Sequence, residues 1–186
     1  MNEIVPNIDT DLDVIFGEYR HHATVEEFVK GVRDAKLTGT LYIGYPVLAV
    51  DDDKIEFDAV LVSRDRGVVI FDLYSFGGQR GGELGHTVPE PTVNRQEQLY
   101  AALYNRLNSF AELRKGRSLL IQLTTVTIHP IADVLKQQGD SILIGLDRLP
   151  NLEIVPVTDR PNDDQVEHLN AAIQRISNLK PRKKRA

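Results

Sequence analysis

The sequence contains no cysteine, which excludes disulfide bonds and thiolate metal sites from this chain. It also contains no apolar run near the roughly 20 residues that a helix needs to cross a bilayer. The opening residues, MNEIVPNIDTDLD, are acidic and lack the basic start and apolar core of a secretory signal. Together these absences predict a cytoplasmic protein.

Motifs of several common enzyme classes are missing as well. No GxGxxG segment follows a strand and no GxxxxGK(S/T) segment occurs, which excludes a Rossmann dinucleotide site and a P-loop. The five histidines show no HExxH spacing, which argues against a zinc site. No serine lies in the GxSxG context of an esterase nucleophile. Any catalytic chemistry must therefore use other residues.

Charge is distributed unevenly along the 186 residues. Of the 22 basic residues, five lie in the last seven positions, whereas all 27 acidic residues precede them. A body this acidic contacts nucleic acid only through a local basic patch. We predict one domain over 1–179, followed by a basic segment over 180–186 that is a flexible linker, a basic arm or the cut end of a longer protein. Its basic residues are Lys180, Arg182, Lys183, Lys184 and Arg185.

Two apolar runs between Lys54 and Tyr74 are the clearest structural signal. They are typical of strands covered on both faces, and the RDRG segment between them is typical of a turn. Each run carries one carboxylate, Asp58 in the first and Asp72 in the second. A buried carboxylate must be paired, bind a metal ion or be neutralised. The two aspartates are therefore the leading candidate site residues.

The turn decides whether the two aspartates meet. A three-residue loop over 65–67, with its glycine left-handed, pairs the strands so that Asp58 lies opposite Tyr74. Asp58 then lies diagonal to Asp72, and all three side chains share one face. A loop one residue shorter or longer would place the aspartates on opposite faces, because side chains alternate along a strand. We predict the three-residue loop.

The remaining segments predict further helices and strands. The residues from Thr24 to Glu27 read as a capping box, followed by an amphipathic helix over 25–36. Other strands are predicted at 41–50, 118–129, 141–145 and 152–157, a short helix at 131–138, and longer helices starting near Asn94 and at Asp163 or Asp164. A glycine- and proline-rich segment after Tyr74 predicts a long loop. This order predicts an α/β fold, with a mixed β-sheet flanked by helices.

The order of acidic residues and elements carries a resemblance. An Asp in the first strand of a hairpin is followed by an acidic residue near the end of the second, and then by Asn94 and Gln98 at a helix start. This pattern resembles the nuclease-related domain (NERD) of the PD-(D/E)XK superfamily, over about Thr24 to Leu146. The resemblance implies a restriction-endonuclease-like fold. Glu26 or Glu27 would supply the helix acid of that family.

The resemblance also implies a metal site. In such nucleases the carboxylates hold one or two Mg²⁺ ions through oxygen ligands, and the metal polarises the phosphate and activates a water molecule. The implied ligands here are Asp58, Asp72 and Glu27, with Gln98 positioned near them. The site that the resemblance implies therefore consists of these four residues and Tyr74, two positions after Asp72.

That position departs from the family. The lysine of the family's Glu-x-Lys motif falls at Tyr74, whose phenol has a pKa near ~10 and no positive charge. A phenol can orient water but cannot neutralise developing charge. Either Arg80 or Lys54 replaces the lysine, or the site no longer cleaves DNA. Arg80 is also a candidate phosphate contact.

A narrower similarity is to the NERD-like region before the motor of some bacterial superfamily-1 DNA helicases. In those proteins a basic, proline-containing linker follows the domain, as LKPRKKRA does here. The similarity implies DNA as a partner and a helicase motor further along the same polypeptide. Two alternatives stay open. One is a non-catalytic DNA-binding or protein-docking module on the same fold, and the other is a small-molecule or structural domain with incidental acids.

Overall fold

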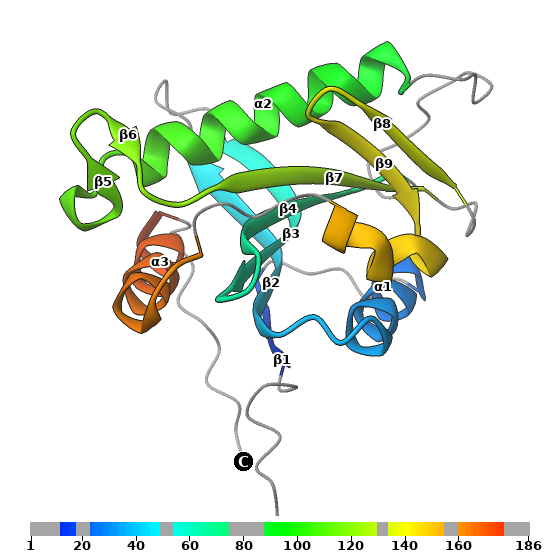
Figure 1. Ribbon diagram of the computed structural model, residues 1–186, viewed down its shortest axis with the longest axis horizontal. Coiled ribbons are helices and arrows are strands. Elements are labelled where there is room, and N and C mark those ends of the chain that lie inside the picture. The colour runs from blue at the N-terminus through cyan, green and yellow to red at the C-terminus, as the bar shows by residue number, and fades with distance from the viewer. Residues whose placement is uncertain are drawn as a thin grey trace, which may run out of the picture.

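A seven-stranded mixed sheet forms the centre of the protein (Figure 1). The computed structural model describes residues 12–17, 23–48, 54–74, 88–129, 134–154 and 160–176. The strand order is β1-β2-β3-β4-β7-β9-β8, and helices cover both faces. This arrangement confirms the predicted α/β class and is consistent with a restriction-endonuclease-like fold. Within the described residues, no helix is both long and apolar enough to span a membrane.

Helices separate groups of strands along the chain. In order they are β1 (Leu12–Phe16), α1 (Ala23–Asp34), β2 (Gly39–Leu48), β3 (Lys54–Ser63), β4 (Gly67–Leu73), α2 (Glu90–Leu107), the 3-10 helix η2 (Ala111–Leu113), β5 (Arg114–Lys115), β6 (Ser118–Leu119), β7 (Leu123–His129), β8 (Leu135–Gln138), β9 (Ser141–Gly145), the 3-10 helix η3 (Leu146–Ile154) and α3 (Asp163–Ile176). The central strands β4, β7 and β9 run parallel, so their carboxyl ends meet at one edge of the sheet. Strands β5 and β6 form a separate small hairpin.

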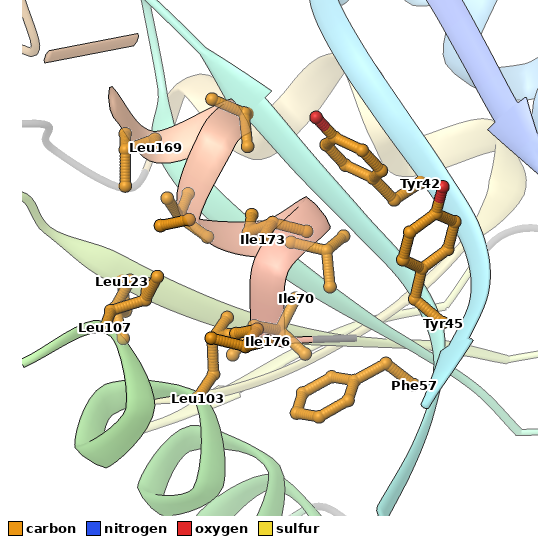
Figure 2. Packing of buried hydrophobic residues seen from close by; sticks show 14 of the residues in the cluster. Tyr42, Tyr45, Phe57, Ile70, Leu103, Leu107, Leu123, Leu169, Ile173 and Ile176 are labelled. Carbon is orange, nitrogen blue, oxygen red and sulfur yellow. The ribbon is translucent and has the colours of Figure 1, made fainter. Parts of the chain in front are cut away.

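Each face of the large sheet has its own apolar core. Helices α2 and α3 pack on one face, where Leu103 and Ile173 lie near Tyr42 and Phe57 of β2 and β3 (Figure 2). Helix α1 and η3 pack on the other face. There the ring of Phe28 meets that of Phe71 edge to face, with centroids 5.0 Å apart. Any side chain on the sheet therefore belongs to one layer or the other.

Strands β2 and β3 change face together near their middle. Tyr42 and Tyr45 both contribute to the core under α2 and α3, although strict alternation would put side chains three positions apart on opposite faces. Gly44 lies between them with φ 66°, a left-handed conformation that glycine adopts without strain. The register on either side of this point is unchanged, which places Gly44 across from Asp58. The kink therefore sets the local course of β3 at the candidate aspartate.

Some elements differ from the sequence prediction. Residues 135–138 form strand β8 instead of a helix, because Gly139, with φ 59°, turns the chain back into a hairpin with β9. Residues 152–154 belong to η3 rather than to a strand, and 155–157 lie outside the described residues. Helix α2 begins at Glu90, earlier than predicted, because a proline in its first turn fits a helix start. Strand β1 was not predicted at all.

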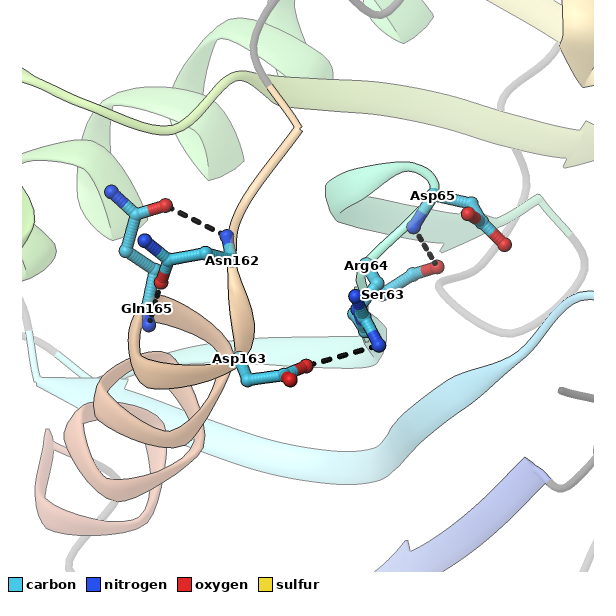
Figure 3. Close-up of polar contacts among 6 residues, drawn as sticks. All are labelled: Ser63, Arg64, Asp65, Asn162, Asp163 and Gln165. Atoms are coloured by element: carbon cyan, nitrogen blue, oxygen red, sulfur yellow. Dashed lines mark hydrogen bonds and ion pairs between the residues drawn. The ribbon is translucent and has the colours of Figure 1, made fainter. Parts of the chain in front are cut away.

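The N-terminal caps of α1 and α3 also differ from the sequence prediction. Helix α1 begins at Ala23, so Thr24 lies inside the helix rather than before it. The cap of α3 is Asn162, not Asp163 or Asp164. The Asn162 side chain accepts a hydrogen bond from the amide of Gln165 (2.8 Å), and Gln165 accepts one from the amide of Asn162 (2.9 Å; Figure 3). This reciprocal pair is the capping-box arrangement.

Candidate functional site

The β3–β4 hairpin has a register different from the predicted one. Ser63 pairs with Gly67, and the three-residue loop consists of 64–66 rather than 65–67. Gly67 is left-handed, with φ 72°, and the amide of Asp65 donates to the hydroxyl of Ser63 (3.2 Å), which closes the loop (Figure 3). Continuing this register along the strands places Asp58 level with Asp72, not with Tyr74. The predicted pairing of Asp58 with Tyr74 is therefore wrong.

Asp58 hydrogen-bonds to the backbone of the neighbouring strand. The regular β3–β4 ladder extends only as far as the pair of Ala59 and Phe71. Beyond it, the Oδ2 atom of Asp58 accepts a hydrogen bond from the amide of Leu73 at 2.8 Å. The carboxylate thus replaces the strand carbonyl that would otherwise satisfy this amide, and an amide left without an acceptor would destabilise the fold. Asp58 has a structural role at the point where the two strands separate.

Asp72 belongs to a buried polar chain between the sheet and α2. The side chain of Asp72 is 0% exposed. Its Oδ2 atom accepts a hydrogen bond from the hydroxyl of Thr127 at 2.9 Å. That hydroxyl in turn accepts a hydrogen bond from Nε2 of Gln96 at 2.8 Å, and the same Nε2 donates to the carbonyl of Ile142 at 2.8 Å. The chain links α2, β7, β4 and β9.

The direction of this chain is fixed by chemistry. The amide nitrogen of Gln96 can only donate, and the hydroxyl of Thr127 has a single proton. Thr127 therefore accepts from Gln96 and gives its proton to the hydrogen bond with Asp72. Both protons of the Gln96 amide are directed at acceptors, so the glutamine side chain has one orientation. This arrangement satisfies a carboxylate group that would otherwise be costly to bury.

Tyr74 and His129 lie where β4 and β7 end. Their ring centroids are 4.7 Å apart at a tilt of 47°, and the amide of Tyr74 donates to the carbonyl of Ile128. Burial lowers the pKa of His129 below its ordinary value, and the charge of Lys136 adds to the effect. At neutral pH the imidazole is therefore uncharged. The position of the family's lysine is thus occupied by an aromatic pair and not by a cation.

Comparison with known proteins adds no identification. No family model matches the chain, and neither a curated protein nor a solved structure matches it. The candidate site must therefore be interpreted from its own residues.

Two predicted site residues lie away from the aspartates. Glu27 and the alternative Glu26 are both exposed on α1. Helix α1 packs on the face of the sheet opposite to α2. Asp72 is directed toward α2 through its chain of hydrogen bonds. The sheet therefore separates the predicted helix acid from Asp72. Gln98 is exposed on α2 and points away from the core.

Gln96 takes the place predicted for Gln98, and the sequence carried a signal for it. Gln96 lies three residues before Leu99 and seven before Leu103, on the stripe of α2 that faces the sheet. A polar residue in such a stripe is buried and needs internal partners. Gln98 lies off the stripe. Arg80 and the basic residues of 180–186 lie outside the described residues.

The described donor set does not fit the implied Mg²⁺ site. Mg²⁺ requires oxygen ligands in octahedral geometry and keeps several of its waters. Here Asp58 accepts a hydrogen bond from a backbone amide, and Asp72 is fully buried and accepts one from the hydroxyl of Thr127. Among the described residues, no group of three or more His, Cys, Asp or Glu side chains could hold a metal ion. The two carboxylates satisfy the protein's own donors instead.

Proposed function

We propose that this chain is a nuclease-related domain that acts in DNA processing without cleaving phosphodiester bonds through Asp58 and Asp72. The observation that carries the non-cleaving part is the buried hydrogen bond of Asp72 with Thr127, together with the use of Asp58 to satisfy the amide of Leu73. The DNA-processing part rests on the resemblance of the strand and helix pattern to nuclease-related domains. The same resemblance supports a helicase motor in the same polypeptide.

Three features support loss of cleavage. The hydrolytic mechanism of such folds needs a metal ion held by accessible carboxylates and a cation that steadies the attacking water. Asp72 is inaccessible to solvent, and Glu27 lies on the other side of the sheet. Tyr74 packs against the uncharged ring of His129 where a lysine would be needed. A domain with this arrangement keeps the fold and the DNA-facing role while the aspartates stabilise the sheet.

Cleavage is tested with plasmid DNA in the presence of Mg²⁺ or Mn²⁺. The wild-type chain is compared with Asp72→Asn and with Asp147→Asn, an exposed carboxylate on η3 that serves as the control. The expected result is no nicking by any of the three proteins. Nicking by the wild type and by Asp147→Asn, but not by Asp72→Asn, would show a working active site and overturn the non-cleaving part.

Metal binding is tested separately by thermal unfolding. A site with a Kd ten times below the added Mg²⁺ concentration would raise the stability by about 1.4 kcal/mol, or roughly 3 to 6 °C in Tm for a chain of this size. We expect no such shift at neutral pH. A shift that disappears in Asp58→Asn would show that the aspartates bind the metal. DNA binding itself is tested by fluorescence anisotropy with a labelled duplex, and its absence at low salt would reject the DNA-processing part.

A further inference from the structure

A small hairpin of exposed cations projects from one end of the molecule. Strands β5 and β6 are joined by Gly116 and Arg117, and they stand apart from the large sheet at the outer edge of the view in Figure 1. Gly116 has φ 66° and Arg117 does not have positive φ, which is the pattern of a type II′ turn. Arg114, Lys115 and Arg117 are all exposed. The hairpin therefore presents three positive charges to solvent.

Apolar residues hold the base of this hairpin in place. Leu113 is fully buried in the core beneath α2 and α3, and Leu119 and Leu120 pack against that core. The amide of Leu120 donates to the carbonyl of Leu113 at 2.8 Å, and the side-chain amide of Asn108 donates to the carbonyl of Arg117 at 3.3 Å. The cations are thus carried on an anchored element and have a defined position relative to α2.

Two further arginines lie in the last turns of α2 and α3, the helices that cover the core in which Leu113 is buried. Arg106 is in the last turn of α2, and its Nε atom is buried without a hydrogen-bond partner in the described structure. Arg175, in the last turn of α3, lies over the ring of Phe110 at 5.5 Å, which places the end of α3 next to the η2 segment. We call Arg106, Arg114, Lys115, Arg117 and Arg175 the basic end.

The charges of the basic end are not neutralised internally. Residues 106–117 contain four basic side chains and a single acidic one, Glu112. In the described part of the chain, no ion pair joins a carboxylate to any of the five residues of the basic end, whereas Arg64 pairs with Asp163 at 3.0 Å elsewhere on the surface (Figure 3). A protein with a net charge of -5 has acidic residues in excess. An unpaired cationic cluster on such a protein attracts an external anion.

We propose that the basic end binds the phosphate backbone of duplex DNA; this inference rests on the proposed role in DNA processing. Arginine and lysine bind phosphates by charge-assisted hydrogen bonds, without reading base sequence. The basic residues of 180–186 follow α3, whose last turn already lies at the basic end.

The hairpin of the basic end lies far from Asp72. Helix α2 runs along β7, with Gln96 near the carboxyl end of that strand and Leu107 packed in the same core as Leu123 at its start. Leu123 and Thr127 are about 13 Å apart along the strand, at roughly 3.3 Å per residue, and the hairpin lies beyond the start of β7. DNA held at the basic end therefore does not need to contact Asp72. This placement fits a domain that binds DNA without cleaving it.

The experiment measures the salt dependence of binding by the full chain to a fluorescently labelled duplex. The test variant is Arg114→Gln/Lys115→Gln. The matched control is Lys30→Gln/Lys36→Gln, which removes the same charge from exposed positions at helix α1, on the opposite face of the sheet from α2. Each phosphate contact contributes about 0.9 to the slope of log K against log salt concentration. The test variant is expected to lower that slope by about 1.8 and to weaken binding roughly ten- to a hundredfold at low salt.

A second variant checks the same surface independently. Arg117→Gln, at the turn, should lower the slope by about 0.9. Because the three substituted hairpin side chains are exposed, the thermal unfolding midpoint of both hairpin variants should equal that of the wild type. If the wild type binds DNA and the hairpin variants bind as well as the control, the basic end is not the contact surface, while the proposed function stands. If the wild type binds no DNA, or only vesicles of anionic lipid, both proposals fall.

Discussion

The buried chain from Gln96 through Thr127 to Asp72 makes one strong prediction about stability. Substituting Thr127 by valine keeps the size and branching of the side chain but removes the hydroxyl. Asp72 then loses the donor at 2.9 Å, and one proton of the Gln96 amide loses the acceptor at 2.8 Å. All three residues are buried, so water cannot easily replace the missing hydroxyl. The Thr127→Val protein should therefore be substantially less stable.

The size of the effect follows from the groups left without partners. A hydrogen bond to a charged group contributes about 1.5 to 3 kcal/mol, and a buried donor left without an acceptor costs about 1 to 3 kcal/mol. Valine offsets part of this loss because it is more apolar than threonine. We therefore expect a net loss of roughly 2 to 4 kcal/mol, which corresponds to a fall in Tm of about 5 to 15 °C for a chain of this size.

The same strand offers a matched control. Thr125 lies two residues earlier on the same face of β7 and is also buried, but its hydroxyl has no hydrogen-bond partner in the part of the chain that the structure describes. Thr125→Val removes a buried group that makes no bond. It should leave the stability unchanged or raise it by about 1 kcal/mol. The same substitution is thus expected to lower the stability at position 127 but not at position 125.

Urea unfolding followed by circular dichroism measures the difference. Thr127→Val should lower the urea midpoint by on the order of 1 M at an unchanged slope, and Thr127→Ser, which keeps the hydroxyl, should lose much less. Equal midpoints for Thr125→Val and Thr127→Val would refute the reasoning. That result would mean that the hydroxyl of Thr127 contributes no more to stability than one that makes no hydrogen bond.

Further predictions concern the hairpin, the glycines and alkaline pH. Asp58→Ala should lower the stability by about 1 to 3 kcal/mol, because the amide of Leu73 loses its acceptor. Asp58→Asn keeps an acceptor oxygen and should retain most of the wild-type stability. Equal losses of stability for the two variants in urea unfolding would contradict this role of Asp58. Gly39→Ala should prevent folding, because Gly39 has φ 125° and a Cβ atom there would lie 2.0 Å from the carbonyl oxygen of Val62. Gly116→Ala has open space around it and should lower the stability by only about 1 kcal/mol, measured by thermal unfolding. Burial is the largest cause that raises the pKa of Tyr42 from 10.0 to about 12. The folded state therefore holds this proton more tightly than the unfolded state does. The resulting contribution to stability should be fully present below pH 10 and be lost as the pH rises to about 12, by up to ~2 to 3 kcal/mol. An alkaline unfolding profile of Tyr42→Phe with the same steepness as the wild type would reject this cause.

Local patterns in the sequence were sufficient to predict the two strands of the central hairpin and the existence of the three long helices. The apolar runs around Asp58 and Asp72 predicted two covered strands, and both lie inside the sheet. The spacing of Val25, Phe28 and Val32 predicted α1, and all three residues are buried. These signals work because burial on one or both faces dictates the hydrophobic period of each element. Together with the order of elements, they were enough for the fold class.

Other features depended on partners far away in the chain. Whether residues 64–66 or 65–67 form the loop depends on how β3 and β4 pair with β2 and β7, and RDRG allows both. The short strand β8 is polar and exists because β9 is available to pair with it. Strand β1 is likewise an edge strand held by β2. Strand propensity is weak in β8, and at both edges of the sheet the available hydrogen-bond partner decides the conformation.

The sequence by itself determined that two acidic side chains would lie in covered strands and would need partners, because a carboxylate is costly to bury in any fold. Only the tertiary structure decided what those partners are. Helix α2 brings Gln96 rather than Gln98 to the sheet, and β7 adds Thr127, so Asp72 is satisfied from inside the protein. The physical reason is that hydrogen bonds are short and directional. A change of one or two residues in register or helix phase therefore exchanges one partner for another without altering the sequence pattern.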